Sequence, residues 1–155
     1  MMKTLNEMKI SFPSKSINEG FARTAVAAFV ASLDPTLDEL TDIKTAVSEA
    51  VTNCVVHGYR ESVSTIYITA AIYPENLVVV KIRDRGCGME NIPKCMEPLY
   101  TTCPEGERAG LGFALMQSLC DKVKVSSKPG SGTTVTLYRK LALRVQGDRL
   151  NKDSK

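Results

Sequence analysis

The sequence has no tryptophan, only one histidine (His57) and no Cys-x-x-Cys pair. A single histidine without paired thiols leaves too few ligands for the usual kinds of zinc site. The cysteines are odd in number and scattered, which fits free thiols in a reducing compartment better than disulfides. They are Cys54, Cys87, Cys95, Cys103 and Cys120.

Long apolar runs are absent as well. No stretch of about 18 consecutive apolar residues occurs, so the sequence predicts no membrane-spanning helix. The N-terminal sequence MMKTLNEMKISF lacks the apolar segment of a secretory signal. We therefore expect a cytoplasmic protein that does not associate with a membrane.

An excess of charge is missing from most of the chain. The net charge is +3, yet the first 139 residues hold 15 basic and 15 acidic side chains. The whole excess lies from Lys140 onward. A balanced folded part argues against direct nucleic-acid binding. The length fits one domain, predicted over residues 1–140. Residues 141–155 are predicted to form a polar, basic and poorly ordered tail.

Two helices are predicted in the first third of the chain. Ser16 and Glu19 have the spacing of a capping box, which predicts a helix over residues 17–33. Its expected buried residues are Phe21, Ala25, Ala28 and Phe29. Asp34-Pro35 breaks the chain, and Thr36 with Glu39 forms a second capping box. A long helix is predicted to follow over residues 38–58, with Gly58 at its end.

The remaining segments predict strands and one further helix. Strands are expected at residues 8–12, 64–73, 77–84, 122–127 and 133–139. A helical turn is possible at 92–96, and a helix over 111–120 should bury Phe113, Leu115 and Leu119. The loop over 98–112, rich in Pro and Gly, is typical of a functional lid. This order predicts an α+β two-layer sandwich, with a mostly antiparallel mixed sheet covered on one face by three helices.

The long helix carries two stripes. Its apolar stripe is predicted to pack on the sheet; it comprises Leu40, Ile43, Val47, Ala50, Val51, Cys54 and Val55. Glu49, Asn53 and His57 recur four residues apart and therefore line a separate stripe. From the helix alone, this polar stripe is either a functional site or a solvated surface.

Glycines mark a second candidate site. Half of the ten glycines fall between Gly86 and Gly112, and Gly110-Leu111-Gly112 opens a predicted helix. Backbone N–H groups at a helix N-terminus favour a phosphate, and Arg108 could add a bidentate contact. The sequence contains no P-loop, and the position of these glycines does not fit a dinucleotide fingerprint.

A third candidate is Asp84-Arg-Gly86-Cys-Gly88, at the end of an apolar strand. An aspartate there could accept a hydrogen bond from the exocyclic amine of adenine, with the glycines letting the ligand approach. A plain Asp-Gly turn is the alternative.

The three sites together, in this order and spacing, resemble the GHKL ATPase superfamily, which includes gyrase, MutL and the catalytic domains of histidine kinases. The resemblance implies the Bergerat, histidine-kinase-like ATPase fold and an ATP and Mg²⁺ site. Asn53 would then coordinate Mg²⁺, Glu49 would serve as the base and Asp84 would contact adenine. The other implied nucleotide contacts are Gly86, Gly88, Thr101, Thr102, Arg108, Gly110, Leu111, Gly112 and Thr134.

A closer resemblance spans about residues 5–140. FAR (21–23), the run over 33–53, HGY (57–59) and Leu99-Tyr-Thr-Thr are similar to the sporulation anti-sigma factors that are serine kinases. This implies a cytoplasmic homodimer that holds a sporulation sigma factor, sigma F, inactive in its ATP-bound form and phosphorylates a serine of an anti-anti-sigma factor. Arg23 matches the arginine that meets both partners.

Two cysteines depart from this family's pattern. Cys54 stands where alanine is common, and Cys103 where the lid usually has lysine.

The alternatives to this function are a related kinase of a stress response, or a non-catalytic module that binds its partner only with ATP. His57 is not expected to be a phosphoacceptor, because it lies within the nucleotide-site helix.

Overall fold

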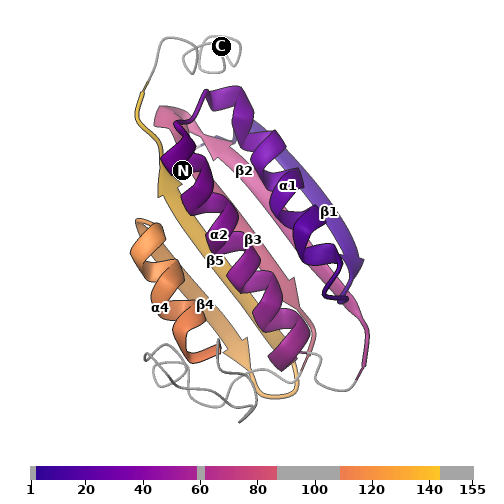
Figure 1. Cartoon of the computed structure of the whole chain (residues 1–155). Coiled ribbons are helices and arrows are strands. Elements are labelled where there is room, and N and C mark those ends of the chain that lie inside the picture. Colours follow the sequence, from indigo (N-terminus) through magenta and orange to yellow (C-terminus); the bar gives the residue numbers. More distant parts are fainter. Residues whose placement is uncertain (1–2, 59–61, 87–108, 144–155) are drawn as a thin grey trace.

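The structure is a computed structural model that describes residues 3–58, 62–86 and 109–143. It forms two layers, a sheet and a layer of helices (Figure 1). The strands are β1 (Asn6–Pro13), β2 (Thr65–Tyr73), β3 (Leu77–Asp84), β4 (Lys122–Lys128) and β5 (Gly132–Lys140). The α-helices are α1 (Asn18–Val30), α2 (Leu37–Asn53) and α4 (Ala109–Leu119), with short helical segments η1 (Ala31–Leu33), η2 (Cys54–Gly58) and η3 (Pro74–Asn76).

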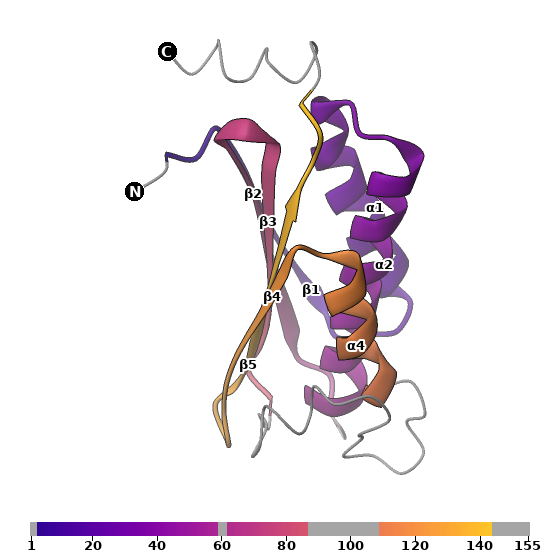
Figure 2. The ribbon, with the colours of Figure 1, turned by 90° about the vertical axis from the view of Figure 1, so that its left-hand side faces the viewer.

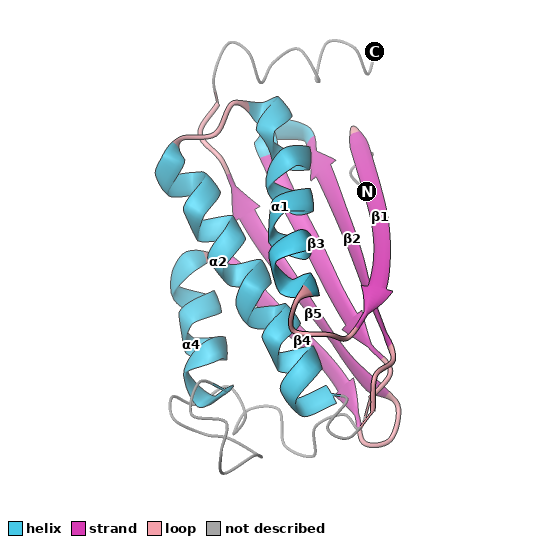
Figure 3. Ribbon diagram, turned by 45° about the vertical axis from the view of Figure 1, so that its right-hand side comes forward, coloured by secondary structure: helices cyan, strands magenta, loops and turns pink. Residues whose placement is uncertain are grey.

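The five strands lie in the order β1-β2-β3-β5-β4, and each neighbouring pair is antiparallel. Helices α1, α2 and α4 all lie on the same side of this sheet (Figure 2). Helix α2 crosses the middle of the sheet between the other two helices (Figure 3). The predicted α+β two-layer sandwich is therefore confirmed, and the described strands pair only in antiparallel fashion.

The core fills the space between the two layers. Strand residues alternate, so that Val78, Val80 and Ile82 of β3 are buried toward the helices. Helix α2 and the first residue of η2 supply the other side of this core with Ile43, Ala46, Val47, Ala50, Val51 and Cys54. Of the predicted stripe, Leu40 and Val55 are only partly buried, and Ala46 is buried in addition. Because it packs along the sheet, the stripe fixes the rotation of α2 and hence the direction of its polar residues.

Helix α1 begins at Asn18, within one residue of the predicted start, but the predicted Ser16–Glu19 capping box does not form. Ile17 precedes the helix with helical backbone angles (φ −62°, ψ −26°), and no side chain caps the helix. In a capping box the Glu19 N–H would donate to the Ser16 hydroxyl oxygen. Instead Asn18 and Glu19 make turn hydrogen bonds to the Lys15 and Ser16 carbonyls, and the Asn18 side chain donates to the Pro13 carbonyl.

The predicted buried face of α1 is also displaced. The buried residues are Ala22, Val26 and Val30, whereas Phe21 is 53% exposed and Ala28 is exposed. The rings of Phe21 and Phe12 meet edge to face, with centroids 6.0 Å apart. Phe21 thus lies at the margin of the core, because the four-residue repeat of small side chains gives α1 a closer fit to α2.

The second capping box is confirmed. Glu39 N–H donates to Thr36 Oγ1 over 3.1 Å, and Thr36 N–H donates to Glu39 Oε1 over 2.9 Å. Helix α2 ends as an α-helix at Asn53 and continues as a π-helical segment, η2, to Gly58. The predicted single helix therefore changes its winding directly after Asn53. Such π-helical turns are frequent at functional sites.

Helix α4 and the end of the chain differ from the prediction in detail. Phe113 is buried as predicted, but Met116 takes the inward position expected for Leu115, which is 36% exposed. Beyond β5, Leu141 is buried and its N–H donates to the Asn76 carbonyl over 3.0 Å. The fold therefore continues past residue 140. The predicted turn at 92–96 and residues 144–155 of the predicted tail lie outside the described residues.

Candidate functional site

Glu49 and Asn53 lie one helical turn apart on α2, and both are buried, at 3% and 9% exposure. They face the first turn of α4, where Gly112 stands. A methyl group on Gly112 would lie 3.3 Å from Glu49 Oε2 and 3.4 Å from Asn53 Oδ1. The structure thus brings three predicted site residues together from two segments of the chain. Because Glu49 and Asn53 are buried, these two residues of the polar stripe do not form a solvated surface.

Asn53 has an unused hydrogen-bond donor. Its Nδ2 is buried and has no hydrogen-bond partner among the described residues. A buried donor without a partner costs about 1–3 kcal/mol, so it is rare unless a ligand supplies the acceptor. Amide and carboxylate oxygens are hard ligands of the kind Mg²⁺ prefers. The residues present therefore fit a phosphate-bearing ligand with Mg²⁺: the Asn53 side-chain oxygen is of the kind that would hold the metal, and its amide nitrogen would be available to a phosphate oxygen.

Asp84 ends strand β3 and is 4% exposed. Its Oδ1 accepts a hydrogen bond from Gly86 N–H over 2.9 Å. Burial raises the pKa of the Asp84 carboxyl, while hydrogen bonds from Gly86, the Cys54 thiol and the Thr133 backbone oppose that rise. The carboxylate is therefore held in place by three donors but shielded from water, as recognition of a ligand donor requires.

Cys54 connects Asp84 with the α2 residues. It follows Asn53 directly, begins the π-helical segment and is buried. Burial, followed by the charge of Asp84, raises the pKa of its thiol well above the ordinary value. The thiol therefore stays protonated and can donate to the Asp84 carboxylate. The sequence predicted Cys54 as a core residue of the apolar stripe and as a departure from a family pattern, but not as a partner of Asp84, because only the fold brings it to the end of β3.

The strand register separates two neighbouring threonines. Asp84 is paired with Thr133, whereas the predicted contact Thr134 is paired with Arg83. Paired residues share a sheet face, so Thr133 lies on the helix side with Asp84 and Thr134 on the other side. Thr133 is therefore the threonine of β5 beside the candidate site. Side chains alternate between the two faces of a strand, and this alternation along β5 was the signal that could have identified Thr133 from the sequence.

Other predicted site residues are only partly described. Gly110 and Leu111 belong to the first turn of α4, and His57 to η2, without a description of their side chains. Gly88, Thr101, Thr102 and Arg108 lie outside the described residues. Arg23 lies on α1 and pairs with Glu19 over 3.2 Å.

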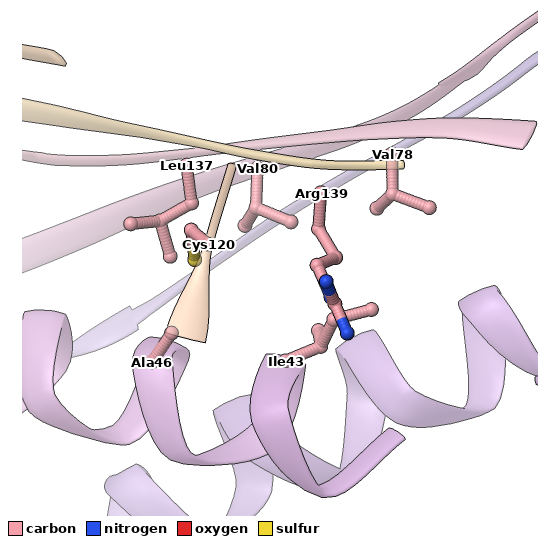
Figure 4. A pocket seen from close by; sticks show the side chains of 7 residues that line it. All are labelled: Ile43, Ala46, Val78, Val80, Cys120, Leu137 and Arg139. Atoms are coloured by element: carbon pink, nitrogen blue, oxygen red, sulfur yellow. The ribbon is translucent and has the colours of Figure 1, made fainter. Parts of the chain in front are cut away.

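A small gap elsewhere in the core is not a second site. It lies between α2, the sheet and Cys120, and Figure 4 shows Val78, Val80 and Leu137 pointing across it toward Ile43 and Ala46. Arg139 also lines this gap, and its guanidinium binds Asp42 over 3.0 Å. The walls of this gap are mostly apolar, and the guanidinium of Arg139 is already paired with Asp42. The gap is therefore an imperfection in core packing.

None of the helices in the described ranges combines the length and apolarity that crossing a bilayer requires. A family model described as "Histidine kinase-like ATPase domain" matches residues 12–139.

Curated relatives match nearly the whole chain. "Anti-sigma F factor" from Thermoanaerobacter sp. (strain X514) is 53% identical over 138 residues, covering 89% of this chain and 96% of the relative. "Anti-sigma F factor" from Clostridium beijerinckii is 51% identical over 135 residues, covering 87% and 94%.

Solved structures share the fold at low sequence identity. The crystal structure of the RsbU and RsbW domains of Rv1364c from Mycobacterium tuberculosis aligns with a TM-score of 0.64 at 22% identity, covering 90% of this chain and 34% of that one. The histidine kinase domain of a blue-light-activated kinase from Erythrobacter litoralis aligns with a TM-score of 0.52 at 17% identity, covering 92% and 66%. The curated relatives and the matched domain model show that the chain belongs to the anti-sigma F factor family and contains a histidine kinase-like ATPase domain.

Proposed function

We propose that this chain inhibits a sporulation sigma factor, sigma F, by binding it in an ATP-bound form, and that it phosphorylates a serine of an anti-anti-sigma factor. It acts as a cytoplasmic homodimer. The relatives named anti-sigma F factor, at about half identity over most of the chain, support the first activity. The kinase-like ATPase domain implies ATP binding and supports the second.

The observation that carries this proposal is the contact geometry of Gly112 with Glu49 and Asn53. It brings a carboxylate, an amide and the N-terminal turn of a helix into one buried place. N–H groups of that turn favour phosphate groups, and the missing side chain at Gly112 lets them approach α2. A solvated helix face would not exclude water in this way. The geometry suits phosphoryl transfer, which depends mainly on positioning and charge stabilisation.

Each residue of the site has a proposed part. Asp84 accepts a hydrogen bond from the adenine amine, and the first turn of α4 holds the phosphates. Asn53 holds Mg²⁺, which supplies positive charge to the phosphate oxygens. Glu49 takes the proton of the substrate serine, since its carboxylate lies one turn from Asn53 on the same buried stripe.

Helix α1 carries the proposed partner surface. Arg23 is partly exposed, and the apolar side chains of Ile17 and Phe21 are 84% and 53% exposed nearby in the sequence. Exposed apolar residues beside a cation are common in protein interfaces. Co-purification of the chain with sigma F, with and without Mg-ATP, tests this part of the proposal. Retention without nucleotide would contradict the requirement for ATP.

Gly112→Ala tests the phosphate site. We expect ATP affinity to fall about tenfold or more, because the added methyl crowds Glu49 and Asn53 where the phosphates approach. The gain of about 0.5–1 kcal/mol that alanine brings over glycine in a helix should be offset by this crowding, because the buried side chains of Glu49 and Asn53 must shift to make room. Calorimetric titration with Mg-ATP and a melting curve measure both effects.

Gly20→Ala is the matched control. Gly20 lies in α1, and a methyl there meets only the end of the Arg23 side chain, at 3.6 Å. Gly20→Ala should bring the full helix-propensity gain in stability, with unchanged ATP affinity. Equal ATP affinity in both variants would place the nucleotide elsewhere.

Asp84→Asn tests adenine recognition. We expect ATP affinity to fall about tenfold, because an acceptor that faces the adenine amine is partly replaced by a donor. Burial raises the pKa of Asp84, so the ionised form disfavours folding at neutral pH, and this cost disappears as the pH falls through the raised pKa. The nucleotide-free variant should therefore melt no lower than the wild type at neutral pH.

The pH dependence of ATP affinity provides the control for Asp84. Wild-type affinity should decline on acidification at a pH above the ordinary aspartate range, because protonation removes the acceptor. The variant should show a flatter profile. If calorimetry gave Asp84→Asn the same ATP affinity as the wild type, Asp84 would have no part in adenine recognition.

A further inference from the structure

The sheet has a second face, on the side away from the helices. Within the described ranges no helix or strand covers it (Figure 2). The strand register places one transverse row of residues on this face, each paired with the next across the five strands. The row is Lys9, Thr69, Lys81, Thr136 and Lys124. Because strands lie about 4.8 Å apart, its three lysines are spaced by about 10 Å.

This row belongs to a basic surface, which we call the open face. Arg83 and Lys122 extend it in the neighbouring rows, and both are exposed. Among the residues of the described strands, Glu7 is the one acidic residue on this face, and it pairs with Lys9 over 3.6 Å. No acidic side chain in the described ranges pairs with Lys81 or Lys124.

The basic open face is balanced by the helical layer. Helices α1 and α2 carry the acidic residues Glu19, Asp38, Glu39, Asp42 and Glu49 against the basic residues Arg23 and Lys44. Among the described elements, the helical layer is therefore acidic and the open face basic, a separation that the balanced charge of the first 139 residues does not reveal. Such a separated field steers a charged partner to one side of the molecule.

The aromatic residues on the open face decide between two kinds of polyanion. Arg85 lies over the Tyr67 ring, 5.1 Å from its centroid, and Lys122 lies over the Tyr138 ring at 5.7 Å. Nucleic-acid bases bind to exposed aromatic rings by stacking. Cations thus cover Tyr67 and Tyr138, the two rings in the rows next to the lysine row. The third aromatic residue of this face, Tyr73, lies at its end opposite Leu77. Around the lysines the open face therefore offers positive charge and no uncovered ring for stacking.

We propose that the open face is a docking surface for a carboxylate-rich segment of a partner protein. It lies opposite the buried cluster of Glu49, Asn53 and Asp84, because Asp84 points to the helix side of β3. A partner bound there leaves the nucleotide site and α1 accessible. The inference is independent of the proposed kinase activity.

The test compares two double variants with the same change in net charge. Lys81→Gln with Lys124→Gln removes two charges from the open face. Lys15→Gln with Lys44→Gln removes two charges from the β1–α1 connection and from α2. Fluorescent poly-L-glutamate and a single-stranded oligothymidylate are titrated against each full chain at low and high salt. Mg-ATP affinity serves as the check that each variant is folded.

We expect wild type to bind poly-L-glutamate in a salt-dependent manner, and more tightly than oligothymidylate. The open-face variant should lose about tenfold in affinity, whereas the control should lose less than about twofold. Equal losses in the two variants, or no binding of poly-L-glutamate by wild type, would overturn the proposal. Tighter binding of oligothymidylate that is lost in the open-face variant would instead make this face a nucleic-acid surface.

Discussion

Glu49→Gln should lower the rate of phosphoryl transfer to the anti-anti-sigma serine by about 10²–10⁴-fold, the usual contribution of a general base. Glutamine has nearly the shape of glutamate, so the buried position at 3% exposure is not emptied. ATP affinity and binding of sigma F should therefore remain. Single-turnover transfer of labelled phosphate, alongside calorimetric titration with Mg-ATP, separates the chemical step from binding.

Glu39→Gln is the matched control on the same helix. Glu39 closes the capping box with Thr36, and glutamine can fill the same role. Both substitutions remove one negative charge from α2, but only Glu49 lies beside Gly112. The rate of the control should stay within about twofold of wild type. An unchanged rate for Glu49→Gln would remove Glu49 from the part of base.

Gly132→Ala should destabilise the fold by about 3 kcal/mol or more. Gly132 has φ +93°, and an added methyl carbon would lie 2.2 Å from the Asp84 carbonyl oxygen and 2.6 Å from Arg85 Cα. The backbone at the end of β3 would have to move away from β5. Since Asp84 begins the displaced segment, ATP affinity should fall as well. Urea unfolding and ATP titration measure the two losses.

Gly130→Ala separates backbone strain from the clash. Gly130 also has a positive φ, +79°, but nothing lies within 4 Å of an added methyl group. The free energy of unfolding of Gly130→Ala should fall by only about 1–2 kcal/mol, the cost of placing alanine in a left-handed backbone conformation, and its ATP affinity should be unchanged. Equal losses in stability and ATP affinity for both variants would show that the contact between Gly132 and Asp84 does not support the site.

Local patterns predicted much of the fold. The strand over residues 77–84 has the predicted bounds, because its continuous Val and Ile residues lie between a turn and Asp84. The Thr36–Glu39 capping box also formed as predicted, since nothing else competes for its two donors. Periodicity then fixed which face of α2 packs on the sheet.

Long-range placement explains the failures. The Ser16–Glu19 box lost its capping role because Glu19 pairs with Arg23 and the turn satisfies its own backbone donors. The difference between Thr133 and Thr134 depends on the pairing of β5 with β3. Cys54 gains its contact with Asp84 only when α2 lies across the end of β3. A sequence without the sheet register cannot supply either contact.

The candidate site was predictable to the extent that its residues share a segment. Glu49 and Asn53 were linked by their spacing, and the structure confirms that they lie together and buried. Their contact with Gly112 joins residues about 60 positions apart in sequence, so only the resemblance to a family could suggest it. The charge of the open face was hidden in the same way, because net charge carries no information on which side of a sheet a lysine lies.

The central claim is that α2 and α4 together form a site that transfers phosphate from ATP to a protein serine. The most direct measurement incubates the full chain with Mg²⁺, ATP labelled in its γ-phosphate and the anti-anti-sigma factor, and locates the label by mass spectrometry. We predict label on one serine of the partner protein, lost with Glu49→Gln. Label on His57 of this chain, or ATP binding without any transfer, would contradict the claim.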